Sequence, residues 1–444
     1  MPLVHPSRRA LLGGAVAGAA LAALPAIPGH ADTPGERSSI EEAVGFLDVM
    51  STAYPASGTP TLPQSYADEL GLFSTAFVYD SALTVCAALA AGRTALARRV
   101  GDGLLFAQEH DPTYHDGRLR QAYNVGPYVF YDGNPSPYGL VLPDGTANIG
   151  WQFGFLGTAV GDMAWPGIAL VRLYAATGEV KYLDGARRIA TWITTKAVNP
   201  GTLGGFRFGT NAADAPIANV STEHNIDCVA FFTMLDAVDG TDWSGAAARA
   251  RAFVERMWQG SFFWTGSNDG STVNTSPIPL DVQAWSWLAM LEPDRLEAPL
   301  WAASNLWTTD VAGQAHSQLP AGFSVSGVTF SSASLTSTAS YNGIPVNPHG
   351  VWCEGTGQLA CALQQRAANR ESTVARTMLS NLSRVQQVLG HGQHVGGKAL
   401  GVGGIVAATS LIDTGFGFGY FQVQHIGATS WYVMAALRHN PLRL

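Results

Sequence analysis

A five-fold recurrence of helix pairs constrains this chain more than any other feature of its sequence. In each pair, a segment that is apolar nearly all round is followed, after a short turn, by an amphipathic segment that carries charged residues. The pairs are Tyr79–Ala91 with Thr94–Glu109, Met163–Ala176 with Lys181–Lys196, Glu223–Val238 with Trp243–Trp258, Asp281–Leu291 with Leu296–Thr308, and Glu354–Ala367 with Arg370–Val388. A sixth apolar segment, Ile426–Arg438, ends the chain, and Ile40–Tyr54 could pair with it to close a ring.

The two kinds of segment predict two rings of helices. A helix that is apolar on all sides is buried, whereas an amphipathic helix keeps one face in solvent. We therefore expect an all-α (α/α)6 toroid of six inner and six outer helices, formed by residues 32–444 as a single domain. The connections from outer to inner segments are long, so they gather on one face of the toroid, where long loops usually carry function. Short strands are expected within them, for example around Phe323–Phe330.

An acidic residue stands near the start of each of the first five inner segments. These residues are Asp80, Asp162, Glu223, Asp281 and Glu354, and His425 stands at the start of the sixth. Acidic residues also favour the first turn of any helix as caps, which is the plain structural explanation. In a toroid, however, all five would point into one central pit, where desolvated carboxylates are costly unless they share protons or bind a ligand.

Glu223 is the first choice for a general acid, because His224, Asn225 and Asp227 add polar groups that a cap does not need. Glu354, Asp162 and Asp80 are the candidates for a partner carboxylate. The sequence-based candidates for ligand contacts are Tyr79, Trp151, Trp165, His224, Asn225, Asp281, Tyr341, Trp352 and His425.

Composition narrows the range of ligands. Charged residues make up 13% of the chain, the net charge is −8, and there are 12 Trp residues. Without a basic cluster, we expect no nucleic-acid partner and no stable membrane association, and we expect a monomer that binds a neutral, hydroxyl-rich ligand. His391 and His394 lie in a Gly-rich loop without an evident acidic partner, so we expect neither a metal ion nor another cofactor.

Residues 1–31 are expected to form an export signal. Arg8 and Arg9 precede the apolar run Ala10–Ile27, which is the layout of a twin-arginine signal peptide. The mature protein is therefore expected to be secreted, to the extracellular space or the cell envelope. The four cysteines have no metal-ligand spacing and are expected to be buried thiols, although a disulfide between neighbouring helices remains open.

The helix pairs and the stretches 79–83, 170–178 and 182–186 resemble the six-hairpin (α/α)6-toroid carbohydrate-active enzymes. The resemblance covers the mature chain and implies a glycoside hydrolase. Two carboxylates in one pit suit this reaction, and inversion is favoured because helix spacing leaves room for a water molecule. The alternatives are a polysaccharide lyase with Tyr341 or His425 as base and Arg207 as carboxylate binder, or a glycan-binding toroid without catalysis.

Overall fold

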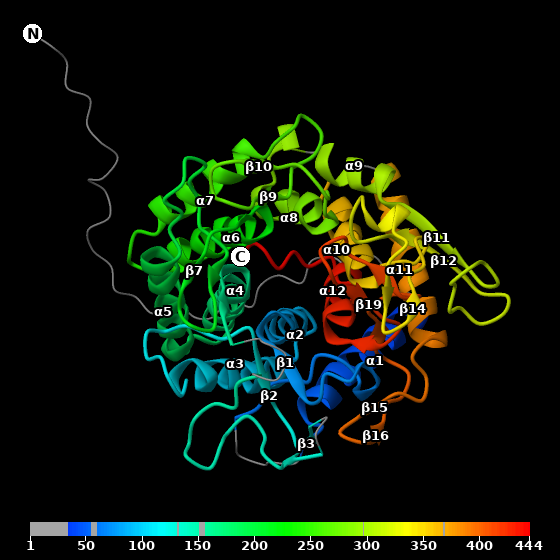
Figure 1. Ribbon diagram of the computed structural model, residues 1–444, viewed down its shortest axis with the longest axis horizontal. Coiled ribbons are helices and arrows are strands. Elements are labelled where there is room, and N and C mark those ends of the chain that lie inside the picture. Colours follow the sequence, from blue (N-terminus) through cyan, green and yellow to red (C-terminus); the bar gives the residue numbers. More distant parts are fainter. Residues whose placement is uncertain (1–33, 55–59, 131–132, 151–155, 296, 367–368) are drawn as a thin grey trace, which may run out of the picture.

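The computed structural model describes residues 34–54, 60–130, 133–150, 156–295, 297–366 and 369–444. Within these residues, twelve α-helices form two concentric rings (Figure 1). The inner helices are α2 (Val78–Ala90), α4 (Val160–Thr177), α6 (Thr222–Val238), α8 (Leu280–Met290), α10 (Cys353–Gln364) and α12 (Ile426–Ala436). The outer helices are α1 (Pro34–Ser51), α3 (Thr94–Glu109), α5 (Val180–Lys196), α7 (Ser244–Arg256), α9 (Glu297–Asn305) and α11 (Asn369–Val388).

Each inner helix packs against the next, and α12 packs against both α2 and α1, so the ring closes as predicted. The composition of each helix explains its place. Residues 280–290 of α8 are all buried, whereas α5 buries one stripe that includes Tyr182, Ala186 and Ile189 and exposes the rest to solvent. The predicted (α/α)6 toroid is confirmed.

Short strands decorate the loops, as expected. They are β1 (Thr75–Phe77), β2 (Ala122–Asn124), β3 (Tyr128–Val129), β4 (Pro135–Ser136), β5 (Thr158–Ala159), β6 (Gly209–Thr210), β7 (Pro216–Ile217), β8 (Val220–Ser221), β9 (Gly266–Ser267), β10 (Val273–Asn274), β11 (Trp307–Val311), β12 (Ser324–Val328), β13 (Ser340–Tyr341), β14 (Ile344–Pro345), β15 (His394–Val395), β16 (Lys398–Ala399), β17 (Ile405–Val406), β18 (Ile412–Asp413), β19 (Gly419–Tyr420) and β20 (Gln424–His425). The pairs described are antiparallel, and the longest, β11 with β12, aligns Trp307 with Val328. The fourth outer helix therefore ends earlier than predicted, because residues 307–311 pair with β12 instead of extending α9.

Three tryptophans close the centre of the ring below the loop face. Trp165, Trp285 and Trp431 are each the sixth residue of α4, α8 and α12, which are alternate inner helices. Their ring centroids lie 5.1 Å apart for Trp165 and Trp285, and 5.9 Å apart for each pair with Trp431. Because every second inner helix contributes a large side chain at one level, the barrel is solid there.

The C-terminal segment seals the opposite end, where it crosses the middle of the ring (Figure 1). Arg172 of α4 donates hydrogen bonds to the carbonyls of Pro441 and Arg443, at 3.4 Å and 2.5 Å. Asn440 donates to the carbonyl of Leu288 at 2.8 Å, and Leu442 is buried. The central space is therefore a pit open only toward the loop face.

Candidate active site

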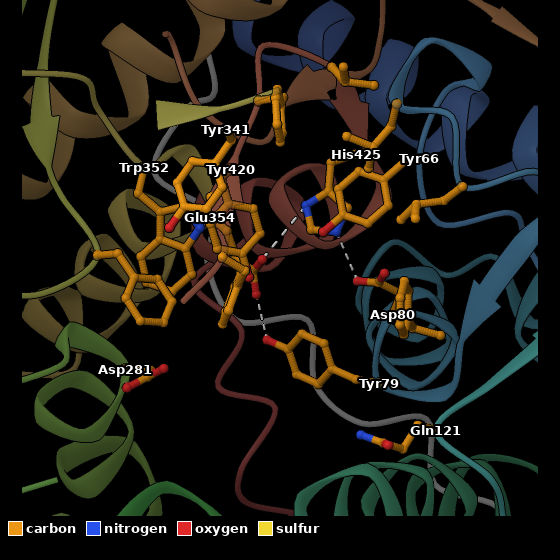
Figure 2. Close-up of a pocket in the computed structure, with 18 of the residues that line it drawn as sticks. Tyr66, Tyr79, Asp80, Gln121, Asp281, Tyr341, Trp352, Glu354, Tyr420 and His425 are labelled. Atoms are coloured by element: carbon orange, nitrogen blue, oxygen red, sulfur yellow. Dashed lines mark hydrogen bonds and ion pairs between the residues drawn. The ribbon is translucent and has the colours of Figure 1, made fainter. Parts of the chain in front are cut away.

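A cavity of about 960 Å³ occupies the loop face at the centre of the toroid. Helix starts and the tips of the long loops form its wall, and Figure 2 shows part of its lining. Its lining includes Tyr66, Glu69, Tyr79, Asp80, Gln121, Asp162, Trp165, Glu223, His224, Asp281, Trp285, Tyr341, Trp352, Glu354, Gln358, Tyr420 and His425.

All five carboxylates predicted at the starts of inner helices face this cavity. They do not serve as N-caps, because the residues in that position are Phe77, Ala159, Ser221, Pro279 and Trp352. Each acid is instead the second or third residue of its helix, where the side chain points toward the ring axis. First-turn positions are compatible with a favourable interaction with the helix dipole, so the convergence of all five acids on one cavity, and not their place in the helix, points to a function.

Among these five acids, Glu354 accepts the most side-chain hydrogen bonds. The Tyr79 hydroxyl donates to its Oε1 at 2.6 Å, and the Gln358 amide donates to the same oxygen at 3.2 Å. Trp431 in turn donates its indole N–H to the Tyr79 oxygen at 3.1 Å, which fixes the phenol. This buried carboxylate is thus held in one orientation by residues of α2, α10 and α12 (Figure 2).

His425 lies between two of the acids. Its Nε2 is 3.1 Å from Asp80 Oδ1, and its Nδ1 is 3.7 Å from Glu354 Oε2. The Tyr66 ring stacks on the imidazole at a centroid distance of 4.1 Å and an interplanar angle of 2°. Burial lowers the pKa of His425, but the Asp80 and Glu354 carboxylates outweigh it, and the net pKa is raised.

The opposite sector of the pit, formed by α4, α6 and α8, carries acids with few partners. Asp162 accepts one hydrogen bond from the Gln121 amide at 3.2 Å. Asp281 accepts one from the N–H of its neighbour Val282 at 2.7 Å, and Figure 2 shows it apart from the Glu354 network. Within the described residues, no group donates a hydrogen bond to Glu223. We call Asp162, Glu223 and Asp281 the bare sector.

A fourth acid lies beneath this sector. Asp227 is the sixth residue of α6, at the level of Trp165 and Trp285 on the flanking helices, and it is 0% exposed. Neither of its carboxylate oxygens forms a well-aligned hydrogen bond among the described residues, although the indole N–H of Trp165 comes near enough to oppose the rise in the Asp227 pKa; the indole N–H of Trp285 also lacks a partner among these residues. Burying such groups unpaired is costly, so this level of the pit is polar and unsatisfied.

The two sectors give their acids different proton affinities. Enclosure in the pit, together with Asp281, Asp227 and Asp162, raises the pKa of Glu223 well above its ordinary value. Enclosure raises the pKa of Glu354 to about 7, and His425 opposes this increase. The surroundings of Glu223 therefore favour its protonated form, while Glu354 ionises near neutral pH, so the pit offers both an acid and a carboxylate.

The predicted contact residues are mostly gathered in this cavity. Tyr79, Trp165, His224, Tyr341 and Trp352 line it, as do Asp281 and His425. Burial lowers the pKa of His224 to about 4, so it is neutral at pH 7. Trp151 lies outside the described residues.

Asn225, which was predicted to contact the ligand, lies outside the cavity lining. Its side chain accepts from the N–H of Phe206 at 2.8 Å and donates to the carbonyls of Phe206 and Ser221. It is fully buried and is not among the described residues that line the cavity. It fastens the loop before α6 to the helix, which is why a polar side chain is needed there.

Sequence reasoning missed several lining residues. Trp285 and Gln358 each lie four residues after an acid of the ring, Asp281 and Glu354, so helical periodicity could have found them. Tyr66, Gln121 and Tyr420 come from loops whose approach to the pit depends on long-range packing, and no local signal marks them.

Two residues named for a lyase are not suited to that role. The Tyr341 hydroxyl donates to Asp413 at 2.6 Å, and burial, together with this carboxylate, raises the pKa of Tyr341 to about 12. Arg207 donates to the carbonyl of Val198 and does not line the cavity. Among the described lining residues there is no Lys or Arg, whereas six carry carboxylates, counting Glu69 at the rim.

The acidic partner of His394, which the sequence does not reveal, is Glu69. The Nδ1 of His394 lies 2.9 Å from the Oε1 of Glu69. The four cysteines are buried free thiols. The described residues contain no group of three or more His, Cys, Asp or Glu side chains arranged to hold a metal ion. Among the described helices, none is long and apolar enough to cross a bilayer.

Comparison with known proteins supports the architecture. No family model matches the chain, and no curated protein matches its sequence significantly. Solved structures with a similar fold include a glycosidase variant in complex with glucose, with 13% identity, a TM-score of 0.57, and coverage of 93% of this chain and 100% of that chain.

Two further similar structures come from different enzyme types. One is the cellobiose 2-epimerase from Bacillus thermoamylovorans, with 11% identity, a TM-score of 0.55, and coverage of 90% and 97% of the two chains. The other is a family 76 α-mannanase from Bacteroides thetaiotaomicron, with 11% identity, a TM-score of 0.53, and coverage of 91% and 95%. At these identities the likeness establishes the (α/α)6 toroid, and the chemistry has to be argued from the site.

Proposed function

We propose that this protein is an exported glycoside hydrolase that cleaves a glycosidic bond by an inverting mechanism. The observation that carries the proposal is the presence, in one closed pit, of two glutamates with opposite surroundings. Glu223 has no hydrogen-bond donor and lies among other acids, whereas Glu354 is held by Tyr79 and Gln358 beside His425. The glycosidase and mannanase among the structural neighbours support the same reading.

In this mechanism Glu223 is the general acid and Glu354 the general base. Glu223 donates its proton to the glycosidic oxygen as the bond from that oxygen to the anomeric carbon breaks. Ionised Glu354 accepts a proton from a water molecule, whose oxygen forms the new bond to the anomeric carbon from the opposite face. The two glutamates belong to α6 and α10, which α8 separates, and this separation favours a water between them over direct attack.

The decisive experiment incubates the protein with a panel of glycans and measures new reducing ends together with the absorbance of unsaturated uronates. Reducing ends without that absorbance are expected. Glu223→Gln should lower kcat by about 10²–10⁴-fold while the circular dichroism spectrum is unchanged. Glu109→Gln, the same change in an exposed ion pair with Arg188 on the outer helix α3, is the matched control and should retain activity. A fully active Glu223→Gln variant would refute the choice of acid.

Proton abstraction beside a carbonyl is the second candidate, because His425 is a buried imidazole between two acids and a cellobiose 2-epimerase has a similar fold. A lyase would give new reducing ends together with the absorbance of unsaturated uronates. Exchange of solvent deuterium into recovered sugar, without new reducing ends, would favour an epimerase over hydrolysis.

Export is also part of the proposal, since residues 1–31 have the twin-arginine layout but lie outside the described residues. Replacing Arg8 and Arg9 with Lys should retain the protein inside the producing cell, as judged by immunoblotting of culture supernatant and cells.

A further inference from the structure

The acids of the pit are distributed unevenly, and this unevenness points to the substrate. On the side of α2, α10 and α12, Asp80 and Glu354 share the imidazole of His425, and Glu354 also accepts a hydrogen bond from the Tyr79 hydroxyl. On the side of α4, α6 and α8, the bare sector has one amide and one backbone N–H as its donors. The acids on the first side have hydrogen-bonding partners within the described residues, whereas those on the second side have no positively charged partner there.

The bare sector combines enclosure with few hydrogen-bond donors. Asp281 is 5% exposed, and its partner Val282 N–H satisfies only Oδ1. Asp227 beneath it is fully buried, and neither of its oxygens forms a well-aligned hydrogen bond among the described residues. Enclosure raises the pKa of both Asp162 and Asp281 to about 7, so these acids are largely protonated below neutral pH. A bound cation would replace those protons.

The aromatic residues of the same sector favour an organic cation. The indole rings of Trp165 and Trp285 line the cavity with their centroids 5.1 Å apart, about one helical turn after Asp162 and Asp281 on α4 and α8. Indole faces attract ammonium groups, and carboxylates form their strongest hydrogen bonds with charged donors. An uncharged hydroxyl would fill the space but would leave the acids protonated.

Resting on the proposed function for the identity of the site, we propose that the glycan bound here carries a free amino group, whose ammonium is held by Asp281 with Asp162 in the bare sector. The ligand class is an amino sugar that is not N-acetylated. The ammonium allows one of these acids to ionise without adding net negative charge beside Glu223, which therefore keeps the proton that it transfers.

The test measures binding of three amino sugars, D-glucosamine, D-galactosamine and D-mannosamine. Each is compared with its parent hexose and its N-acetyl derivative at about pH 6, where the amine is charged. Tryptophan fluorescence and calorimetry are the readouts. At least one amino sugar should bind about 10-fold or more tightly than both of its uncharged counterparts. Calorimetry in buffers of different ionisation enthalpy should show release of close to one proton for each ammonium bound.

Variants test whether the acids of the bare sector cause the preference for an amino sugar. Asp281→Asn should bring the affinity ratio of amine to hexose close to one, and Asp162→Asn should reduce it in the same direction. Asp102→Asn makes the same change in an exposed ion pair with Lys181 on the outer helix α3, outside the cavity, and should leave the ratio unchanged. Circular dichroism checks that each variant is folded. The affinity ratio of amine to hexose in the unmodified protein tests the inference even if a variant does not fold.

Several results would overturn the inference. They are equal binding of amine and hexose for all three sugars, no binding of any amino sugar, a preference that survives Asp281→Asn, or displacement of the amino sugar by an equal concentration of ammonium or calcium chloride. Hydrolysis of neutral glycans without a preference for the amine would overturn the inference and leave the hydrolase intact. Proton-linked binding of the amine without hydrolysis of any glycan would support the inference and overturn the proposed hydrolase.

Discussion

His425 makes the charge on Glu354 depend on a second residue. The imidazole contacts Asp80 through Nε2 and approaches Glu354 through Nδ1, and it lowers the pKa of Glu354 against the larger, raising effect of burial. Tyr66 covers one face of the ring, so the imidazole cannot swing away. His425 thereby shifts the pH range in which Glu354 is ionised.

Replacing this imidazole should move one limb of the pH profile. Glu354 must be ionised to act as base, so activity rises with pH through its pKa, which is about 7. His425→Gln removes the opposing positive charge, and the acid limb of kcat/KM should shift upward by about one unit or more. His394→Gln, the same change in an exposed pair with Glu69, is the control. An unmoved limb in a folded His425→Gln variant would mean that His425 has only a packing role.

Helices were predictable from the sequence because their signal is local. Apolar residues recur with the helical period, and their pattern distinguishes inner from outer helices without knowledge of the partner. The pairing of residues 307–311 with 324–328 was missed, because strand pairing is decided between segments rather than within one. Likewise, the polar cluster at the start of α6 predicted a site for Asn225, but the loop at Phe206 takes up that side chain.

Two inner helices approach each other closely, and this leads to a prediction about stability. A Cβ on Gly167 of α4 would lie 2.5 Å from the Phe231 ring of α6, closer than packed atoms allow. Gly167→Ala should therefore reduce the free energy of unfolding by about 1–3 kcal/mol. Gly45→Ala, in the exposed face of the outer helix α1 with no atom within 4 Å, should instead stabilise by up to about 1 kcal/mol.

Urea unfolding of the two glycine variants measures this difference. Opposite signs are expected, because the same methyl group restricts the unfolded chain in both variants but meets a neighbour only at Gly167. Equal stabilisation by both changes would show that α4 and α6 can separate, and that the inner ring is more loosely packed than the structure indicates.

Folding of the toroid raises the pKa values of three acids above those they have in the unfolded chain. Asp162, Asp281 and Glu354 have pKa values of about 7 in the fold, against ordinary values of 3.8, 3.8 and 4.5. Between about pH 4 and pH 7 the folded protein consequently binds more protons than the unfolded chain. Stability that depends on those protons is present below this range and is lost as pH rises through it.

The melting temperature of the ligand-free protein should therefore fall as pH rises from about 5 to about 7.5. A double variant, Asp162→Asn with Asp281→Asn, should flatten this dependence, because an amide does not titrate. The Asp111–Arg120 pair is a useful contrast, since hydrogen bonds from Arg120 outweigh burial and lower the pKa of Asp111, and its effect lies at more acidic pH. A melting temperature that rises toward pH 7.5 in the unmodified protein would contradict the raised values. If the bare sector binds an ammonium, an amino sugar should raise the melting temperature more at pH 7.5 than at pH 5, since at the lower pH the cation must displace protons.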